Sequence, residues 1–194
     1  RLLEQQDRSV AEALERKGVL DEQGVGDRRF ARRMEALLCH KRPVIVGPWT
    51  GEVGFELIYW IPFVRWVLRT YQIPADRLWV VSRGGTQSWY GDVAARYVDA
   101  FEFFSPDEFR TATAEAKKQR RVGSFDTAVV DRVVSAHQLG RPDLLHPGLM
   151  YRLFMPFWKD LATLARVDQY AIYERMARPP ESLPEDLPDQ YIAA

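Results

Sequence analysis

Residues 44–56 read VIVGPWTGEVGFE, and this stretch decides the fold. Its first three residues form a short run of β-branched apolar side chains, which is typical of a strand buried on both faces. Glycines at positions 47, 51 and 54 follow, and an apolar segment of helical length then extends over 55–71. A buried strand, a glycine-rich loop and a helix in this order open a βαβ unit.

The same order repeats further along the chain. Residues 78–81 (LWVV) form a second strand of the buried type, which ends in the loop sequence SRGG at 82–85. We predict a helix over 88–97 and a third strand over 98–104. Since crossovers between parallel strands are right-handed, this pattern predicts an α/β fold with a Rossmann-like parallel sheet and helices on both faces.

The part of the chain beyond this sheet is predicted to be mainly helical. The sequence SPDE at 105–108 is a strong helix start, with Ser at the N-cap, Pro in the first turn and Glu at the capping-box position. This helix should extend to about residue 121. Further helices are predicted over 125–139 and 160–177, separated by an aromatic-rich stretch that ends at Trp158.

The two ends of the chain differ in composition from its centre. Residues 1–42 are predicted to form an N-terminal helical appendage, in which two helices carry mixed Arg and Glu residues. Residues 43–178 form the predicted α/β domain. Residues 179–194 begin with a Pro-rich acidic stretch of linker composition, and the last four residues resemble the start of a strand in a following domain.

Composition excludes several classes of function. The 194 residues carry 27 Lys and Arg against 27 Asp and Glu, so no basic excess favours a nucleic-acid partner. The single cysteine, Cys39, excludes an internal disulfide framework and a multi-cysteine metal site. No apolar run approaches the roughly 18–20 residues that span a bilayer. We therefore expect a cytoplasmic protein without a transmembrane segment, either free or peripheral at the inner membrane face, with no metal and no bound cofactor.

The loop after the first strand is the first candidate site. In parallel sheets, ligands bind beyond the carboxyl ends of the strands, where helix N-termini offer free N–H groups. The loop lacks both Gly-x-Gly-x-x-Gly and Gly-Lys-Ser/Thr, and its two glutamates oppose a phosphate. We predict that it binds a polyhydroxylated or cationic group, through Trp49, Thr50, Gly51, Gly54 and Glu56, with Glu52 as a general base. Alternatively, the glycines only make the turn and the acids only cap the helix.

The loop after the second strand is the second candidate site. Arg83 is suited to a phosphate or carboxylate, Gly84 and Gly85 permit close approach of the backbone, and Trp89 offers a stacking face. If the two strands are parallel neighbours, Glu52 and Arg83 reach one bound ligand. The alternative is that the two side chains form an ion pair with each other, or that Arg83 pairs with another nearby acid.

The three histidines provide one further candidate. His146 precedes Pro147 and Gly148 in a predicted turn, which is a suitable position for a reserve general base. His40 and His137 are interpreted as surface or packing residues. No Gly-x-Ser-x-Gly elbow is present, so a Ser–His–Asp hydrolase is not indicated.

Taken together, residues 44–63 and the motifs VVSRGG at 80–85 and SWY at 88–90 resemble the N-terminal half of bacterial glycosyltransferase-like proteins of GT-B architecture. The resemblance covers roughly residues 43–160. It implies two Rossmann-like domains that face a cleft, one holding the sugar acceptor and the other the nucleotide-sugar donor. It further implies a role in cell-surface glycan biosynthesis, with Glu52 or His146 as the base. The donor-binding half is not part of this sequence.

Two other classes of function compete with this interpretation. The first is a non-catalytic α/β module whose crevice binds a glycan or a partner protein. The second is a phosphatase or a kinase-like enzyme, against which the lack of an Asp-rich metal motif and of a phosphate loop argues.

Overall fold

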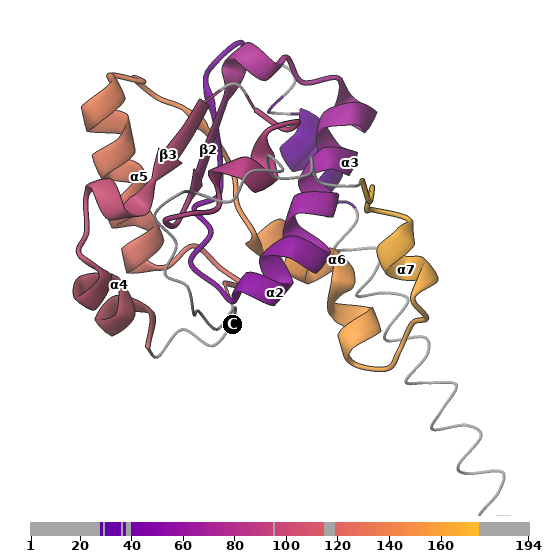
Figure 1. The fold of residues 1–194 in the computed structure, drawn as a ribbon. Helices are drawn as coiled ribbons and strands as arrows, with labels where there is room; N and C mark the ends of the chain where they lie inside the picture. Colours follow the sequence, from indigo (N-terminus) through magenta and orange to yellow (C-terminus); the bar gives the residue numbers. More distant parts are fainter. Residues whose placement is uncertain are drawn as a thin grey trace, which may run out of the picture.

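A four-stranded, all-parallel sheet forms the centre of the computed structural model (Figure 1). The structure describes residues 28, 30–35, 37, 40–94, 96–114 and 119–174; the predicted helix over 2–17 and the predicted linker over 179–194 lie outside them. The strand order is β3-β2-β1-β4, which confirms the predicted Rossmann-like α/β fold. The strands are β1 (Val44–Val46), β2 (Leu78–Ser82), β3 (Arg96–Asp99) and β4 (Asp143–Leu145).

Helices connect these strands in the manner of a βαβ fold. The helix predicted over 55–71 is present and contains one π-helical stretch, so that it consists of α2 (Val53–Phe55), η1 (Glu56–Trp60) and α3 (Ile61–Tyr71). The remaining helical segments, in chain order, are η2 (Ala75–Arg77), η3 (Gln87–Tyr90), η4 (Ala100–Glu102), α4 (Pro106–Thr113), α5 (Ser124–His137), α6 (Gly148–Trp158) and α7 (Ala165–Asp168).

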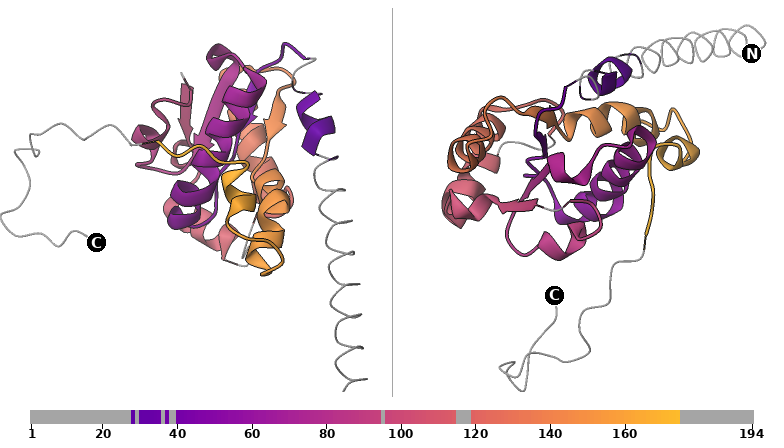
Figure 2. Two further views of the ribbon diagram at one scale, coloured as in Figure 1. Left: turned by 90° about the vertical axis from the view of Figure 1, so that its right-hand side faces the viewer. Right: turned by 90° about the horizontal axis from the view of Figure 1, so that it is seen from above.

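The alternation of side chains along the strands produces two hydrophobic cores. Val44 and Val46 of β1 face one core, which also contains the apolar sides of α3 and α6. Ile45 faces the other core, which contains side chains of α4 and α5. Figures 1 and 2 show the sheet between these two helical layers. The protein therefore has three layers, and the carboxyl ends of all four strands lie at one edge of the sheet.

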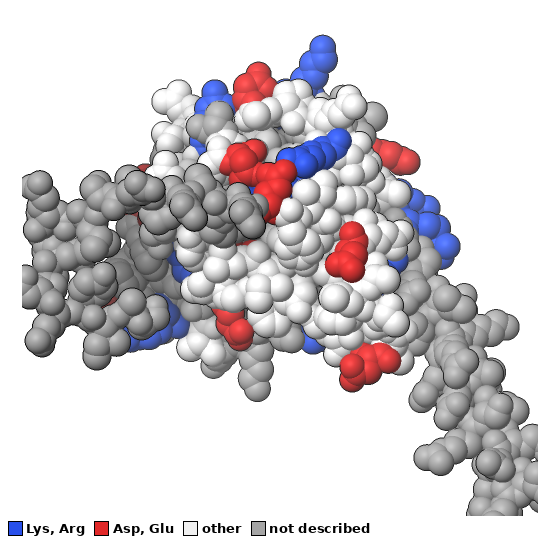
Figure 3. Space-filling model, turned by 45° about the vertical axis from the view of Figure 1, so that its right-hand side comes forward, with Lys and Arg blue, Asp and Glu red and all other residues white. Residues whose placement is uncertain are grey.

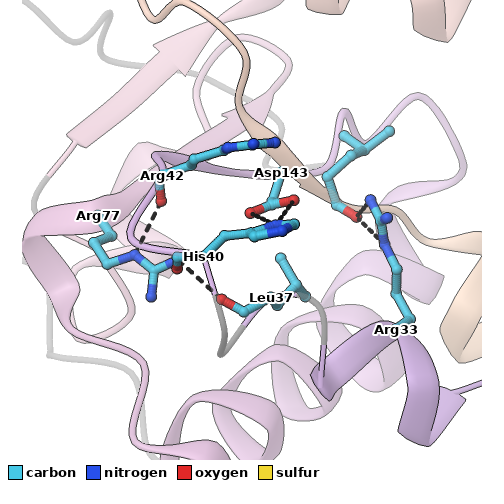
Figure 4. Close-up of polar contacts among 7 residues, drawn as sticks. Arg33, Leu37, His40, Arg42, Arg77 and Asp143 are labelled. Atoms are coloured by element: carbon cyan, nitrogen blue, oxygen red, sulfur yellow. Dashed lines mark hydrogen bonds and ion pairs between the residues drawn. The ribbon is translucent and has the colours of Figure 1, made fainter.

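The described part of the segment before β1 packs onto this domain. Phe30, Met34 and Leu37 are buried in the same core as α3, with the ring of Phe30 5.7 Å from that of Trp66. Arg77 donates hydrogen bonds to the carbonyl oxygens of Leu37, His40 and Arg42, as Figure 4 shows. The side chain of His40 lies 3.2 Å from both carboxylate oxygens of Asp143 on β4. These contacts attach the segment to η2, just before β2, and to β4.

Arg33 from this segment also reaches the sheet. Its Nη2 and Nε atoms donate to the carbonyl oxygen of Leu144, at 2.9 and 3.3 Å (Figure 4). The flanking residues of β4 bond toward β1 instead, because Asp143 N donates to Pro43 O and Gly47 N donates to Leu145 O. Since bonding groups alternate along a parallel strand, the Leu144 carbonyl points away from β1, and Arg33 satisfies it at the outer edge of the sheet.

Several predicted elements are wrong in extent. The described part of the segment 88–97 forms only the short η3 before β3 begins at Arg96, so the third strand lies over 96–99 and not over 98–104. The helix with the predicted capping box at Ser105 is present, but it ends at Thr113. The aromatic-rich stretch before 160 is helix α6, whereas only 165–168 is helical among the described residues, 160–174, of the predicted last helix. Strand β4 was not predicted.

Candidate functional site

The two predicted site loops leave the sheet side by side. β1 and β2 are parallel neighbours with Val46 opposite Val80, and the backbone N–H of Trp49 donates to Val81 O at 3.0 Å. Both loops therefore begin at the carboxyl edge of the sheet, as predicted. Their side chains, however, are distributed between the surface and the interior.

Glu52 is the exposed acid of the first loop. It occupies the N-cap position of α2 with an extended backbone, and its side chain makes no capping hydrogen bond. The pKa of Tyr151 on α6 is raised to about 12, chiefly by burial and also by the nearby negative charge of Glu52, while the charge of Arg120 acts to lower it. Glu52 and Arg120 are therefore both close to the Tyr151 hydroxyl.

Glu56 is the buried acid of the first loop. Its side chain is fully buried, and its Oε1 accepts hydrogen bonds from Ser82 Oγ at 2.5 Å and from Tyr90 Oη at 2.6 Å. The Nη2 atom of Arg83 lies 4.0 Å from Oε2 of Glu56, and these two buried atoms have no hydrogen-bond partner among the described residues. We call these four residues the Glu56 cluster. Arg83 thus faces Glu56. The ion pair that the sequence allowed between Arg83 and Glu52 is therefore formed with Glu56 instead, one helical turn after Glu52.

The π-helical geometry begins at this same glutamate. The backbone N–H of Ile61 donates to Glu56 O, five residues earlier, and such π-helical turns are frequent at functional sites. Burial raises the pKa of Glu56, although the hydrogen bonds from Ser82 and Tyr90 and the charge of Arg83 oppose this effect. The cluster therefore keeps a carboxyl group inside the protein at the end of β2. Its Glu56 Oε2 and Arg83 Nη2 atoms can still form a hydrogen bond with a ligand.

We expect Glu56→Gln to change the pH dependence of stability. Because the pKa of Glu56 is raised above its ordinary value of 4.5 in the folded state, the unfolded state loses the proton first as pH rises. The contribution of Glu56 to the free energy of unfolding is thus fully present below about pH 4.5 and is lost as pH rises through the folded-state pKa. The total loss is about 1.4 kcal/mol for each unit by which the folded-state pKa exceeds the unfolded-state pKa.

The glutamine variant has no such proton to lose. Its free energy of unfolding, measured in urea between pH 4 and 8, should therefore improve relative to wild type as pH rises. A difference that stays constant over this range, or that changes in the opposite direction, would contradict the assignment. Glu52→Gln is the control, because the exposed Glu52 side chain lies outside the cluster.

The remaining predicted residues of the first loop serve packing. Trp49 is fully buried, with its ring stacked between Trp60 (centroids 5.9 Å apart) and Tyr151 (6.4 Å). Gly51 lies against this ring, since a Cβ there would be 3.1 Å from it. The backbone N–H of Thr50 donates to Gln119 Oε1 at 2.9 Å. The stacked ring of Trp49 therefore forms part of the core, and Gly54 lies in open space on α2.

His146 lies in a buried polar network between the loops after β1 and β4. Its Nδ1 accepts from the backbone N–H of Gly148 at 3.0 Å, so its Nε2 carries the proton and donates to Asp126 Oδ2 at 3.2 Å. Asp126 also accepts from Gln119 Nε2 at 2.9 Å and from the backbone N–H of Gly123 at 2.8 Å. We call this the Asp126 network. Both ring nitrogens of His146 are occupied in it, so the histidine holds the loop in this structure.

The network fills a position where parallel sheets usually bind ligands. β1 has β2 on one side and β4 on the other, so the strand order reverses here, and ligands usually bind at such a switch point. In this chain Gln119 spans the gap, because its Nε2 also donates to Pro48 O at 2.9 Å. The usual crevice is therefore occupied by the protein's own side chains, and open space lies on either side of it.

The larger of these spaces is a cleft beside the ends of β2 and β3. It has a volume of about 870 Å³ and carries two carboxylates, Asp99 and Glu102, beside the ring of Phe101; we call it the acidic cleft. Gly85 lines it with a φ of +82°, a conformation that favours glycine. Gly84 allows the ring of Phe101 to approach, since a Cβ there would be 2.7 Å from it.

Other groups of the second loop fix the wall of this cleft. Tyr97 donates to the carbonyl oxygen of Arg83 at 2.7 Å and lies 2.8 Å from Thr86 Oγ1. Trp89 is half-buried against the core that contains α3 and α6. The cleft is thus lined by the predicted Gly85 and by residues of β3 and η4 that sequence reasoning did not select. A signal for them existed, because Asp99 and Glu102 have the spacing of a capping box, and the structure contains that box.

Comparisons with protein-family models, with curated proteins and with solved structures gave no match. Among the described residues, no helix is long and apolar enough to cross a membrane. No group of three or more His, Cys, Asp or Glu side chains in the described part of the chain is arranged to hold a metal ion. The class of protein that the structure defines is accordingly a Rossmann-like α/β domain with an acidic cleft at the carboxyl edge of its sheet.

Proposed function

We propose that this chain supplies the acceptor-side domain of a glycosyltransferase of GT-B architecture, and that the acidic cleft holds the sugar acceptor. The observation that carries the proposal is the composition of that cleft. Carboxylates accept hydrogen bonds from sugar hydroxyls, and each of the two carboxylates has more acceptor positions than its backbone contact uses. The ring of Phe101, 38% exposed, offers an apolar face for the C–H side of a sugar ring.

The chemistry of transfer follows from this arrangement. The acceptor hydroxyl attacks the anomeric carbon of a nucleotide-activated sugar, the bond to the leaving phosphate breaks, and a base removes the hydroxyl proton. Glu52 is the proposed base, because it is exposed at the same edge of the sheet and its carboxylate has no hydrogen bond among the described residues. The donor would be held by a further domain, and the work of the enzyme would be cytoplasmic.

Substitutions in the acidic cleft test the binding step. Asp99→Asn and Glu102→Gln keep the acceptor oxygens of the η4 capping box but remove the charges. Because hydrogen bonds to charged groups are stronger than neutral ones by about 1 kcal/mol, each variant should weaken oligosaccharide binding by roughly five- to tenfold. Calorimetric titration of this chain with a panel of oligosaccharides measures the effect.

The control variant is Asp131→Asn, which removes one exposed charge on α5. It should bind like wild type. Equal weakening in all three variants, or no saturable binding of any oligosaccharide, would contradict the acceptor role of the cleft. In a protein that also contains the donor domain, Glu52→Gln should lower turnover while leaving acceptor affinity unchanged; unchanged turnover removes Glu52 from the role of base.

A non-catalytic protein-interaction module is the second candidate, and a different observation favours it. The start of α2–η1 and the end of α6 lie together, since the rings of Phe55 and Tyr59 are 5.6 and 5.1 Å from that of Trp158. Figure 3 shows few charges on this side of the molecule. The exposed apolar side chains of α2–η1 are Val53 and Ile58, and those just after α6 are Leu161 and Leu164. No saturable oligosaccharide binding by the cleft, together with no transfer activity in the presence of a donor domain, would favour this module over the enzyme.

A further inference from the structure

A second cavity, lined by five arginines, lies on the other side of the Asp126 network. Its volume is about 330 Å³, and it is located beyond the carboxyl end of β4. Arg32 and Arg33 come from the segment before β1, Arg120 and Arg121 from the loop before α5, and Arg152 from α6. We call it the arginine cavity. Three separate parts of the chain thus bring arginine side chains to one concave site.

The charge of this cavity is not compensated by the residues that line it. No Asp or Glu is among its described lining residues. Arg33 is fixed by the Leu144 carbonyl, which is a neutral partner. The side chains of the other four arginines make no hydrogen bond or ion pair among the described residues; they are Arg32, Arg120, Arg121 and Arg152. Because arginine does not lose its proton in proteins, five positive charges are concentrated here in a chain whose net charge is zero.

Such a concentration of like charge is unfavourable unless an anion is present. The backbone adds to the field, because α6 begins at Gly148 in the wall of the cavity with the positive end of its dipole. Gly148 also allows the backbone of Arg120 to lie close to this helix start, since a Cβ there would be 2.8 Å from Arg120 O. The loop that carries Arg120 and Arg121 is therefore held against the start of the helix that carries Arg152.

The shape of the cavity distinguishes between possible anions. A concave space of about 330 Å³ lies at the lower end of the range for small-molecule sites, whereas an extended polyanion needs an open surface. The planar fork of a guanidinium matches the oxygens of a phosphate in a bidentate manner. Two phosphate groups carry about three to four negative charges, which is close to the charge of the five arginines.

We propose that the arginine cavity binds the phosphate groups of a phosphorylated small molecule, with a diphosphate as the best match in size and charge. The proposal goes beyond the sugar cleft and does not depend on it, since the two sites share no lining residue. It also assigns a ligand to arginines of the segment before β1, which the sequence predicted only as a helical appendage of mixed charge.

Inorganic pyrophosphate is the probe for the test. Calorimetric titration at constant ionic strength should show saturable binding by the wild-type chain, with a Kd of about 1 mM or tighter. Arg120→Gln and Arg152→Gln each remove one guanidinium, and each should weaken binding by about tenfold. Arg110→Gln is the matched control, because Arg110 is an exposed arginine on α4 whose described partner is Asp107; it should bind like wild type.

The outcomes separate the possible ligands. No saturable binding of pyrophosphate, or equal weakening in all three arginine variants, would overturn the proposal, and so would binding of a long polyanion such as heparin without binding of pyrophosphate. A nucleoside diphosphate that binds more tightly than pyrophosphate would identify a nucleotide source, and equal affinities would show that only the phosphates are recognised. Thermal unfolding of each variant checks the fold, which these exposed substitutions should leave within about 0.5 kcal/mol of wild type. Loss of sugar binding in the acidic cleft would leave this result unaffected.

Discussion

Gly47→Ala should destabilise the protein by about 3 kcal/mol or more, the sum of an unfavourable backbone conformation and a steric clash. Gly47 has a φ of +122°, in the region that favours glycine. A Cβ at this position would lie 2.4 Å from Val81 O and 3.0 Å from Trp49 N. These two atoms form the hydrogen bond that attaches the first loop to β2. The methyl group would therefore separate the two loops at the point where they leave the sheet.

Urea denaturation followed by circular dichroism measures this effect, and Gly54→Ala is the control. Gly54 lies in α2 with nothing within 4 Å of its ideal Cβ. Alanine there should be neutral or should stabilise by up to about 1 kcal/mol, because it is the better helix former. Similar midpoints for the two variants would show that the loop after β1 is not fixed to β2 as described.

Asp126→Ala should destabilise the protein by about 3–4 kcal/mol, because it removes the acceptor of two buried side-chain donors and of one part-buried backbone N–H. The donors are His146, Gln119 and the backbone N–H of Gly123. Gln119 in turn holds the backbone of the first loop at Pro48 and Thr50. Loss of this one carboxylate should thus loosen the loops after both β1 and β4. Asp131→Ala, an exposed position on the same helix, should change stability by less than about 0.5 kcal/mol.

The Asp126 effect should also depend on pH. Burial acts to raise the pKa of Asp126, but the hydrogen bonds from His146, Gly123 and Gln119 lower it below its ordinary value of 3.8. Its contribution to stability is therefore present above that value and is lost as pH falls through the folded-state pKa. The difference between wild type and Asp126→Ala should shrink below about pH 4. A difference that grows on acidification would contradict the network.

The sequence was sufficient to predict the centre of the fold. A run of β-branched residues followed by glycines predicted β1, and the similar run at 78–81 predicted β2 and a shared edge for the two loops. Strand β4 could not be predicted in the same way, because it is three residues long, begins with Asp143 and contains no β-branched residue. It is a strand because it pairs with β1. The two strands are almost a hundred residues apart in the sequence, so the residues around 143–145 carry no local sign of this pairing.

The candidate site was predictable in its location but not in the direction of its side chains. Glu52 and Glu56 are four residues apart in the same loop and helix start, and nothing local decides which one is buried. The structure buries Glu56 because Ser82 and Tyr90 of the next loop donate to it. The arginine cavity was not predicted, since its five side chains come from three parts of the chain that only the fold brings together.

The contact between Arg33 and Leu144 has a consequence for solubility. β4 is an edge strand, and the unpaired carbonyl and N–H groups of an edge strand are a template on which a second chain can add a strand. Here the guanidinium of Arg33 occupies the outward carbonyl, and the strand is only three residues long. A positively charged side chain thus covers the acceptor that an incoming strand would need. The exposed border of the sheet is protected against aggregation by the same arginine that lines the cavity beside it.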